Sequence, residues 1–479
     1  MRRLLQHALF ALLVVTALGA GCTSGPQEAL ARRFPAWLKP CKLEPAGVAV
    51  LCGSFEVPEN RSAPEGRKLS LRVAVLRAYD RPQPDPVFVI AGGPGESAVN
   101  LASALGADTL AEAGRDRDIV FIDQRGTGQS NPFHCDLFGE RNPVEQLARL
   151  DFFPAEALKQ CLANFPGDPR MYTTRHALAD LEEIRAAIGY PLIFLDGASY
   201  GSRAALEYIR GYGQRVGAAV ITSSSPTHRE AMEASAGAAE RALRGVFADC
   251  SARPECAKEF PDPERELREV LRRLRAAPAV AGVRPREDAP EVRIRVTPEL
   301  FQTCLRMMLY SAETSAQIPA VIRHAHRGDF QPALRGLAPM AFLMRRGLST
   351  GMFLTVWCNE FAPMQRAEDF DRQQDGLLGA DTLVESAFRA CAAWPREETA
   401  SAPVKSDVPV LLFSGERDPA TPAEASREMA RHLERSRHIV VRGAGHQIGH
   451  DACRARIIAY FFRNPAGAAP LDTSCLPQP

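Results

Sequence analysis

The sequence predicts an α/β fold in which a mostly parallel sheet is flanked by helices and carries a large helical insertion. Apolar runs typical of buried strands alternate with helical patterns, such as that of residues 177–188. These strand-like runs are 69–76, 87–90, 119–122, 192–195, 219–222, 410–413 and 439–441. The alternation stops after residue 226 and resumes near residue 408. We therefore expect the core over residues 23–226 and 401–479, and a helical lid over residues 227–400.

The first strand-like segments, 48–57 and 69–76, have no helical crossover between them, so we expect an antiparallel edge. Inside the lid, Asp262 followed by Pro263 predicts the start of a helix. The residues that would form its apolar face are Leu267, Val270, Leu271 and Leu274. Residues 277–290 are interpreted as a proline-rich linker.

Composition excludes some classes of function. Of the 479 residues, 46% are hydrophobic and 24% are charged, which is ordinary for a globular protein. The net charge of +1 gives no electrostatic support for a nucleic-acid partner. After the N-terminus, no stretch is apolar and long enough to predict a membrane span.

The N-terminus has the pattern of an export signal over residues 1–22. Arg2 and Arg3 precede a mostly apolar stretch over 4–18, and the small residues Gly19-Ala20-Gly21 precede Cys22. This order predicts a lipoprotein signal with Cys22 acylated after cleavage, although a larger aliphatic residue is usual at the position of Gly19. We expect a periplasmic or outer-membrane lipoprotein, and the alternative is cleavage with release. Membrane contact is expected only through that lipid.

Twelve cysteines are typical of an exported, oxidised protein. Without Cys22, eleven remain, which allows five pairs and one free thiol. Short spacing favours the pairs Cys41–Cys52, Cys135–Cys161, Cys250–Cys256 and Cys453–Cys475. Cys358–Cys391 is a plausible fifth pair, which leaves Cys304, although sequence alone does not fix the connectivity. No Cys-x-x-Cys pair is present, so no structural zinc is expected.

A candidate nucleophile is Ser199 in Gly197-Ala198-Ser199-Tyr200-Gly201. This motif lies between the apolar run 191–195 and the helical stretch 202–209. A serine at such a strand–turn–helix apex is held out of the sheet, and flanking glycines allow the sharp turn. A second match, 347–351, does not follow a strand, so Ser349 is expected to be a loop or helix-end residue.

The acid and base candidates follow later strands in the order serine, acid, histidine. Asp418 follows run 410–413 after four intervening residues, with Glu416 as the nearest competitor. His446 follows the strand ending at residue 441 through a glycine-rich loop, with His450 as its rival. A base removes the serine proton, and an acid holds the base in one tautomer.

Two backbone N–H groups are candidates for stabilising an oxyanion. One belongs to Tyr200, the residue after the nucleophile. The other is assigned to Gly93, in the loop Ala91-Gly92-Gly93-Pro94-Gly95 that follows strand 87–90. A third glycine-rich loop contains Arg125, which is expected to brace the neighbouring loops by pairing with a carboxylate.

Together these motifs resemble the α/β-hydrolase peptidases of the prolyl and tripeptidyl aminopeptidase group. The matching segments, in chain order, are Gly92-Gly93-Pro94-Gly95, residues 123–130, residues 197–201, residues 415–422 and Gly445-His446. The last part of the chain resembles the C-terminal segment typical of tripeptidyl aminopeptidases. The resemblance implies an α/β-hydrolase fold and an exopeptidase that acts on a free N-terminus.

Such an enzyme must bind the substrate ammonium, and in related prolyl enzymes a carboxylate of the lid does so. Cys358-Asn359-Glu360 stands where the family carries a Cys-x-Asp/Glu element, so the resemblance implies Glu360 as the amine anchor. Glu96, near the oxyanion loop, is a second acidic candidate. Two positions depart from the family's pattern: Ala91 stands where prolyl aminopeptidases usually carry histidine, and Glu96 where a neutral residue is common.

We therefore expect an exported serine hydrolase, an aminopeptidase that cleaves short peptides through an acyl-enzyme. The triad would be Ser199, His446 and Asp418, and no metal or organic cofactor is expected. A carboxylesterase with the same triad is the first alternative, because this machinery cleaves esters and amides alike. A non-catalytic envelope lipoprotein that reuses the fold is the second.

Overall fold

The computed structural model describes residues 34–477, apart from 81, 140, 285–289, 372, 374–375, 398, 400, 450–451, 466 and 468–469. Residues Trp37–Pro479 form one compact unit. The other unit is Met1–Ala36, of which the structure describes residues 34–36 only. The expected signal peptide and Cys22 therefore lie outside the described residues. Within the described part, no helix has both the length and the hydropathy needed to cross a bilayer.

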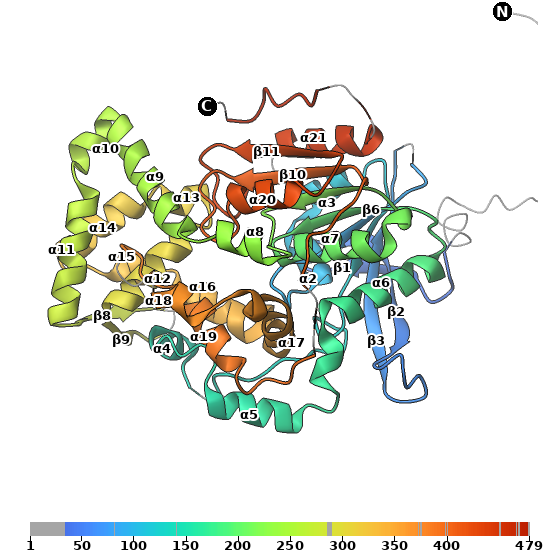
Figure 1. Cartoon of the computed structure of the whole chain (residues 1–479), viewed down its shortest axis with the longest axis horizontal. Coiled ribbons are helices and arrows are strands. Elements are labelled where there is room, and N and C mark those ends of the chain that lie inside the picture. The colour runs from blue at the N-terminus through green and yellow to red at the C-terminus, as the bar shows by residue number, and fades with distance from the viewer. Residues whose placement is uncertain are drawn as a thin grey trace, which may run out of the picture. The chain divides into compact units, whose positions relative to one another are not determined.

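A nine-stranded sheet, counted over the described residues, organises the larger unit (Figure 1). The strands lie in the order β1-β2-β3-β5-β4-β6-β7-β10-β11. The pairs from β1 to β5 are antiparallel, and all pairs from β5 to β11 are parallel. The strands are β1 (Lys39–Leu43), β2 (Val48–Pro58), β3 (Lys68–Leu76), β4 (Val87–Ile90), β5 (Ile119–Ile122), β6 (Ile193–Ala198), β7 (Val216–Thr222), β10 (Val410–Gly415) and β11 (Ser436–Val441).

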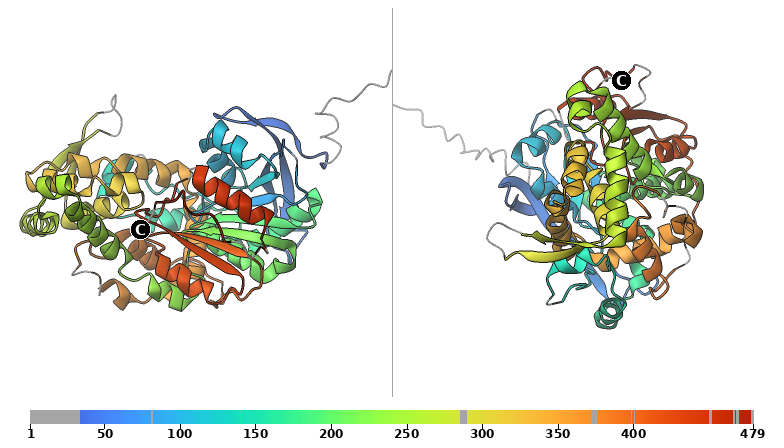
Figure 2. Two further views of the ribbon diagram at one scale, coloured as in Figure 1. Left: turned by 90° about the horizontal axis from the view of Figure 1, so that it is seen from above. Right: turned by 90° about the vertical axis from the view of Figure 1, so that its left-hand side faces the viewer.

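Helices cover both faces of this sheet, which explains why its central strands are apolar on both sides. On one face, α21 (Ala452–Arg463) packs Ile457 and Phe461 against Val220 and Phe413 (Figure 2). The other helices of the core are α2 (Ala98–Ala104), α3 (Ala107–Ala113), α4 (Pro143–Ala148), α5 (Ala155–Asn164), η1 (Pro169–Tyr172), α6 (Thr174–Ile188), α7 (Tyr200–Tyr212), η2 (Gly213–Arg215) and α20 (Ala423–Ala430). The predicted α/β class, its mostly parallel sheet and its antiparallel edge are confirmed.

Between β7 and β10 the chain forms a mainly helical insertion. Its helices are α8 (Arg229–Ala234), α9 (Ala238–Ala252), α10 (Pro254–Glu259), α11 (Pro263–Ala276), α12 (Pro298–Met308), α13 (Ala312–Ser315), α14 (Ile318–His326), α15 (Gln331–Leu334), α16 (Leu337–Phe342), η3 (Leu343–Gly347), α17 (Thr350–Val356), η4 (Trp357–Phe361), η5 (Ala362–Met364), α18 (Ala367–Asp371) and α19 (Thr382–Ala390). Asp262 caps α11 as predicted, since its side chain accepts the Arg265 N–H.

The linker predicted over residues 277–290 is wrong in part. Strands β8 (Ala279–Val283) and β9 (Val292–Val296) pair antiparallel in a hairpin instead. In β9 the residues alternate between buried and exposed, as a half-buried strand requires. The prolines of residues 277–290 lie outside the two strands, where they do not interrupt the ladder.

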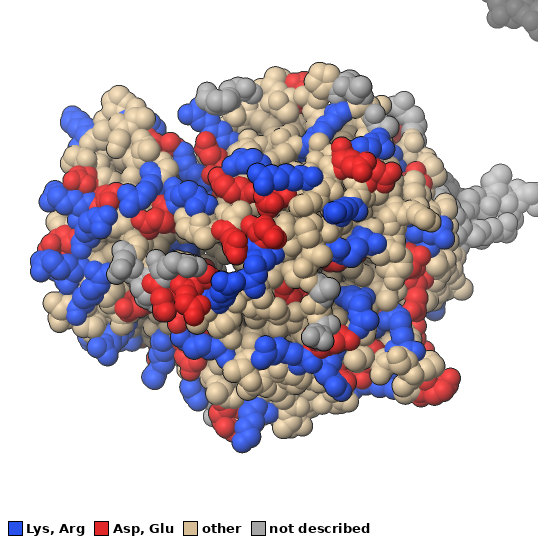
Figure 3. All heavy atoms as spheres, viewed as in Figure 1, with Lys and Arg blue, Asp and Glu red and all other residues tan. Residues whose placement is uncertain are grey.

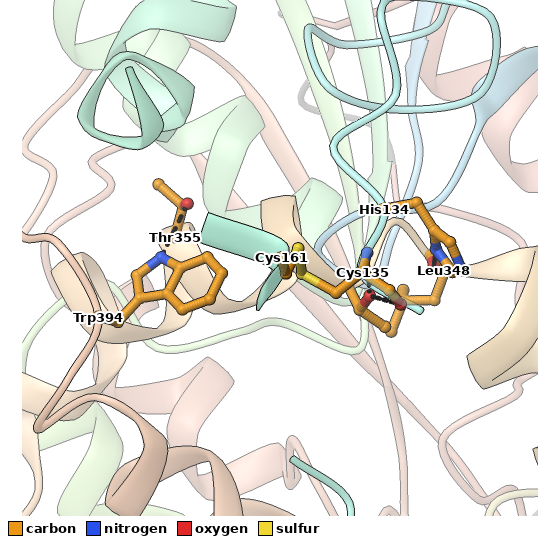
Figure 4. The surroundings of a disulfide bond; sticks show 7 residues. His134, Cys135, Cys161, Leu348, Thr355 and Trp394 are labelled. Atoms are coloured by element: carbon orange, nitrogen blue, oxygen red, sulfur yellow. Dashed lines mark hydrogen bonds between the residues drawn. A yellow bond between two sulfur atoms is a disulfide. The ribbon is translucent and has the colours of Figure 1, made fainter. Parts of the chain in front are cut away.

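The five predicted disulfides are all present, and Cys304 is free and buried. One of them, Cys135–Cys161, lies beside a contact between a core loop and the insertion (Figure 4). There, the Cys135 N–H donates to Thr350 Oγ1 over 2.9 Å, and the His134 ring lies 3.0 Å from the Leu348 carbonyl oxygen. The disulfide therefore restrains the loop that holds the start of α17.

Arg125 braces the core through a carboxylate, as its loop position suggested. Its guanidinium is fully buried and pairs bidentately with Asp180 of α6, at 2.6 and 2.7 Å. It also donates to the carbonyl oxygens of Glu59 and Met171, both at 2.8 Å. One cation thus joins the loop after β5 to the end of β2, to η1 and to the middle of α6.

We predict that Asp180→Asn lowers the free energy of unfolding by about 3–5 kcal/mol, because it leaves the buried Arg125 charge without its partner. Urea unfolding followed by circular dichroism measures this loss. The control is Glu112→Gln, which removes a carboxylate from an exposed pair with Arg115 and should leave the unfolding midpoint almost unchanged. Equal midpoints for Asp180→Asn and the wild type would contradict the bracing role.

Candidate active site

Ser199 occupies a strained turn between β6 and α7. Its φ of 54° and ψ of −126° are rarely adopted by residues other than glycine. A Cβ built on Gly201 would lie 2.1 Å from the Ile90 carbonyl oxygen, and one on Gly197 would lie 2.3 Å from the Gly201 oxygen. Both glycines are thus required by close backbone contact, and the turn lifts the serine to the carboxyl end of β6.

The second Gly-x-Ser-x-Gly match has a different origin. Ser349 has an ordinary φ of −76° and directly precedes α17, as a helix-end serine does. Gly351 is tightly packed, because a Cβ there would lie 2.4 Å from the Phe133 ring. This glycine therefore serves packing between the insertion and the core, and Ser349 is not at an elbow.

Asp418 and His446 are brought together by two adjacent parallel strands, β10 and β11. His446 Nδ1 lies 3.0 Å from Asp418 Oδ2 and 3.1 Å from Oδ1. The loop that carries His446 crosses directly over β10, since a Cβ on Gly415 would lie 2.0 Å from the Gly445 carbonyl oxygen. Glu416, the competing acid, instead accepts the Gly443 N–H. His450 lies outside the described residues.

Ser199 and His446 line the same cavity at the carboxyl ends of the strands. In this conformation, no hydrogen bond joins the Ser199 hydroxyl to the His446 ring, both of which are described. Such bonds are often long before substrate binds and shorten in the reactive complex. The pocket thus brings the candidate nucleophile Ser199 and the candidate base His446 to one rim of the sheet, and Asp418 contacts His446 there.

The Asp418–His446 pair sets the protonation of both groups. Burial alone would raise the pKa of Asp418, but the His446 charge, its hydrogen bond and the N–H groups of Thr421 and Ala420 bring that pKa below its usual value. Burial alone would lower the pKa of His446, but Asp418, with a smaller contribution from Glu96, raises it above its usual value.

Thr421 is part of this pair and was missed in the sequence. Its hydroxyl donates to Asp418 Oδ2 over 2.8 Å and lies 3.0 Å from His446 Nδ1. The N–H groups of Ala420 and Thr421 both donate to Asp418 Oδ1, at 2.9 and 2.8 Å. The signal was the spacing Asp418-x-x-Thr421 in a proline-flanked turn, where aspartate side chains commonly accept from the backbone that follows.

The two oxyanion candidates flank Ser199 in the cavity. Tyr200 is the first residue of α7, and Gly93 has a φ of 101° in the loop after β4. Within the described residues, neither N–H donates to another group of the protein. Both donors are therefore free to bind an oxygen of the substrate.

Glu96 lies next to Ser199, the candidate nucleophile. A Cβ built on Gly92 would lie 3.1 Å from Glu96 Oε2 and 3.5 Å from Ser199 Cβ, so carboxylate and serine flank the same glycine. The Gly92 N–H donates to this carboxylate. Burial raises the pKa of Glu96, while His446 and the Gly92 N–H act in the opposite direction.

Glu360 is not placed in the substrate cavity, so the expected ammonium contact is corrected. Its buried carboxylate accepts from Arg203 Nε over 3.0 Å, and from the N–H and the hydroxyl of Thr174, both over 2.8 Å. It is not among the residues that line the cavity. The physical reason is that Arg203 of α7 lies nearby. The buried carboxylate pairs with this arginine, because leaving either buried charge unpaired is costly.

The cavity has a volume of about 1980 Å³ and lies between the strand ends and the insertion. Its lining is mostly apolar, and the insertion contributes large side chains to it, namely Met344, Leu348, Phe353, Trp357 and Phe361. Tyr310, also from the insertion, packs its ring 5.1 Å from that of His446. The insertion therefore covers the site as a lid.

Comparison with known families assigns the chain. Residues 85–320 match the model of the alpha/beta hydrolase fold, and residues 378–475 match that of the TAP-like proteins. The two matches together cover most of the chain, which belongs to the α/β-hydrolases. The second match begins within the last part of the insertion and includes both Asp418 and His446.

Relatives of this α/β-hydrolase span most of its length. Serine protease Hip1 of Mycobacterium tuberculosis is 25% identical over 432 residues, covering 81% of this chain and 79% of the relative. Tripeptidyl aminopeptidase of Streptomyces coelicolor is 24% identical over 471 residues, covering 90% and 83%. Among solved structures, proline iminopeptidase of Mycobacterium smegmatis aligns over 86% of this chain and 98% of its own, with 16% identity and a TM-score of 0.40.

We predict that the acidic limb of the kcat/KM profile lies above pH 6.5. His446 must be neutral to accept the serine proton, and its pKa is raised, so activity falls as the pH drops through that raised value. Glu96→Gln removes a negative charge that favours the imidazolium, so the limb should move to lower pH. The control is the exposed Glu424→Gln, which should not move it. A limb that is unmoved or raised in Glu96→Gln would contradict this electrostatic coupling.

We also predict that Thr421→Val lowers kcat by about ten- to a hundredfold. The variant keeps the side-chain shape but removes a hydrogen bond to a charged carboxylate, and such a bond contributes about 1.5–3 kcal/mol. Thr421→Ser should recover most of the activity because it restores the hydroxyl. Steady-state kinetics on one chromogenic substrate measures all three proteins. Full activity of Thr421→Val would show that Asp418 orients His446 unaided.

Proposed function

We propose that this protein is an exported serine aminopeptidase that removes short peptides or single residues from a free N-terminus. The observation that carries the proposal is the Asp418–His446 pair, whose histidine lines one cavity with Ser199 and two free N–H donors. The relatives named serine protease and tripeptidyl aminopeptidase support peptide bonds as the substrate class.

The proposed reaction follows from these positions. His446 Nε2 accepts the hydroxyl proton as Ser199 Oγ attacks the carbonyl carbon, while Asp418 holds Nδ1 in the protonated tautomer. The Gly93 and Tyr200 N–H groups bind the developing oxyanion. His446 then protonates the leaving amine, and a water molecule activated by the same ring hydrolyses the acyl-enzyme.

The lid favours short substrates with an accessible end. It covers the cavity with bulky side chains, so an extended or folded chain would have to enter end first. The ammonium group of such a substrate needs an acidic partner, and we assign this role to Glu96, because Glu360 is already paired. Glu96 adjoins Ser199 and therefore suits an ammonium one residue before the scissile bond. With three residues before the scissile bond, the ammonium would lie about 7 Å further from Ser199, since an extended chain advances about 3.3 Å per residue.

Export is supported by the N-terminal sequence and by the cysteines. The pattern of residues 1–22 matches a lipoprotein signal that ends at Cys22, and ten cysteines form disulfides, as expected in an oxidising compartment. We propose a periplasmic or outer-membrane lipoprotein, or else a secreted enzyme.

The test compares peptides of one sequence with free and with acetylated N-termini, with one, two or three residues before a chromogenic leaving group. We expect kcat/KM to favour the free amine by about ten- to a hundredfold, because a charge-assisted contact contributes about 1.5–3 kcal/mol. The peptide length with the largest ratio of kcat/KM for the free amine to kcat/KM for the acetylated form identifies the number of residues removed.

Ser199→Ala is the matched control and should lose at least about a thousandfold in kcat on every substrate. Retained activity in this variant would show that Ser199 is not the nucleophile. Equal rates on free and acetylated substrates, with Ser199 still required, would instead favour the carboxylesterase alternative.

A further inference from the structure

A second cluster of functional side chains lies outside the catalytic cavity, where the lid begins. His228 directly precedes α8, the first helix of the insertion, and Glu428 and His432 come from the last turn of α20 and the residues after it. One ligand atom from each of these three residues lies within 4.8 Å of the other two. In Figure 1, α8 and α20 lie side by side near the centre of the view.

Local structure brings these three side chains together. Glu428 and His432 are four residues apart at the end of a helix, so their side chains leave the same face. Strand β7 leads through residues 223–227 to His228, which is held 1% exposed against that face. The rings of His228 and His432 meet edge to face with centroids 5.4 Å apart.

His228 has a buried ring nitrogen without a hydrogen-bond partner. Its Nδ1 lies 3.1 Å from Thr227 Oγ1, whereas its Nε2 is buried and has no partner among the described residues. An unpaired buried nitrogen of this kind costs free energy unless a ligand satisfies it. In metal sites, a histidine commonly forms a hydrogen bond through one ring nitrogen and ligates through the other.

We propose that His228, Glu428 and His432 bind one divalent transition-metal ion of the zinc type at the junction of lid and core. Two imidazoles and one carboxylate are a ligand set typical of Zn²⁺, with the fourth position open to water. Calcium and magnesium prefer six or more oxygen ligands, which this set does not supply.

The surrounding charges are compatible with such an ion. Glu230 of α8 lies near His228 and adds negative charge. Arg203 is also near, but its charge is already neutralised by Glu360. Arg431 pairs with Oε2 of Glu428, so the ion would take the other oxygen or displace this exposed arginine. Figure 3 shows acidic and basic side chains together over this part of the face.

The ion would link elements on both sides of the lid boundary. None of the three ligands lines the catalytic cavity, so the site is separate from the hydrolytic machinery. It would tie the start of α8 to the end of α20, a helix that begins two residues after Thr421. A ligand that binds only the folded state stabilises it in proportion to the logarithm of its concentration over Kd, so zinc should raise Tm.

Calorimetric titration of the purified, tag-free protein with ZnCl₂, after treatment with EDTA and its removal, tests this site. We expect one zinc per chain and a rise in Tm on zinc addition. His432→Ala and Glu428→Gln should each weaken zinc binding by at least about tenfold and reduce the rise in Tm. Both side chains are partly exposed, so these variants should fold, unlike variants of the buried His228.

The control variant is His324→Ala, which removes an exposed histidine that lies beside Asp329, and it should bind zinc as the wild type does. Replacement of zinc by Co²⁺ should give the visible absorption of a four-coordinate site in the wild type and lose it in His432→Ala. The absence of stoichiometric zinc binding in the wild type would overturn the proposal. Undiminished binding in both His432→Ala and Glu428→Gln would overturn it as well.

Discussion

The close approach of three backbone segments at Gly197 and Gly201 is the constraint on which the site depends. Strand β4, strand β6 and helix α7 meet there with no room for a single Cβ atom. Only this packing holds Ser199 in a conformation that other residues avoid, because the surrounding contacts compensate for the strain. The same approach places the loop after β4 beside the serine, so the candidate nucleophile and the candidate oxyanion donors are positioned by one set of contacts.

The candidate base and acid are positioned by a similar close backbone approach, at strands β10 and β11. The carbonyl oxygen of Gly445 passes directly over Gly415, and this contact fixes the height of the His446 loop above β10. The Asp418 carboxylate is held by two backbone N–H groups and by Thr421, so its orientation does not depend on the histidine. Backbone contacts at glycines thus do most of the positioning, while side chains supply the chemistry.

Most of the fold and the candidate triad could be predicted from the sequence because their signals are local. Short apolar runs, the flanking glycines of Ser199 and the strand-end positions of Asp418 and His446 can all be recognised within short windows. The role expected of Glu360 failed for the opposite reason. Its partners Arg203 and Thr174 are distant in sequence, and nothing near Glu360 indicates that they converge on it. In the hairpin, strand β9 has a local alternation, but the prolines of residues 277–290 favoured a linker.

The pairing of Glu360 with Arg203 has a consequence for how the covered cavity can open. Arg203 belongs to the helix that follows the nucleophile, and both charged groups are buried. Separating them would leave two unpaired charges buried away from water, at a cost of several kcal/mol. The segment around η4 is therefore anchored to helix α7. Any hinge that admits substrate must lie elsewhere in the insertion.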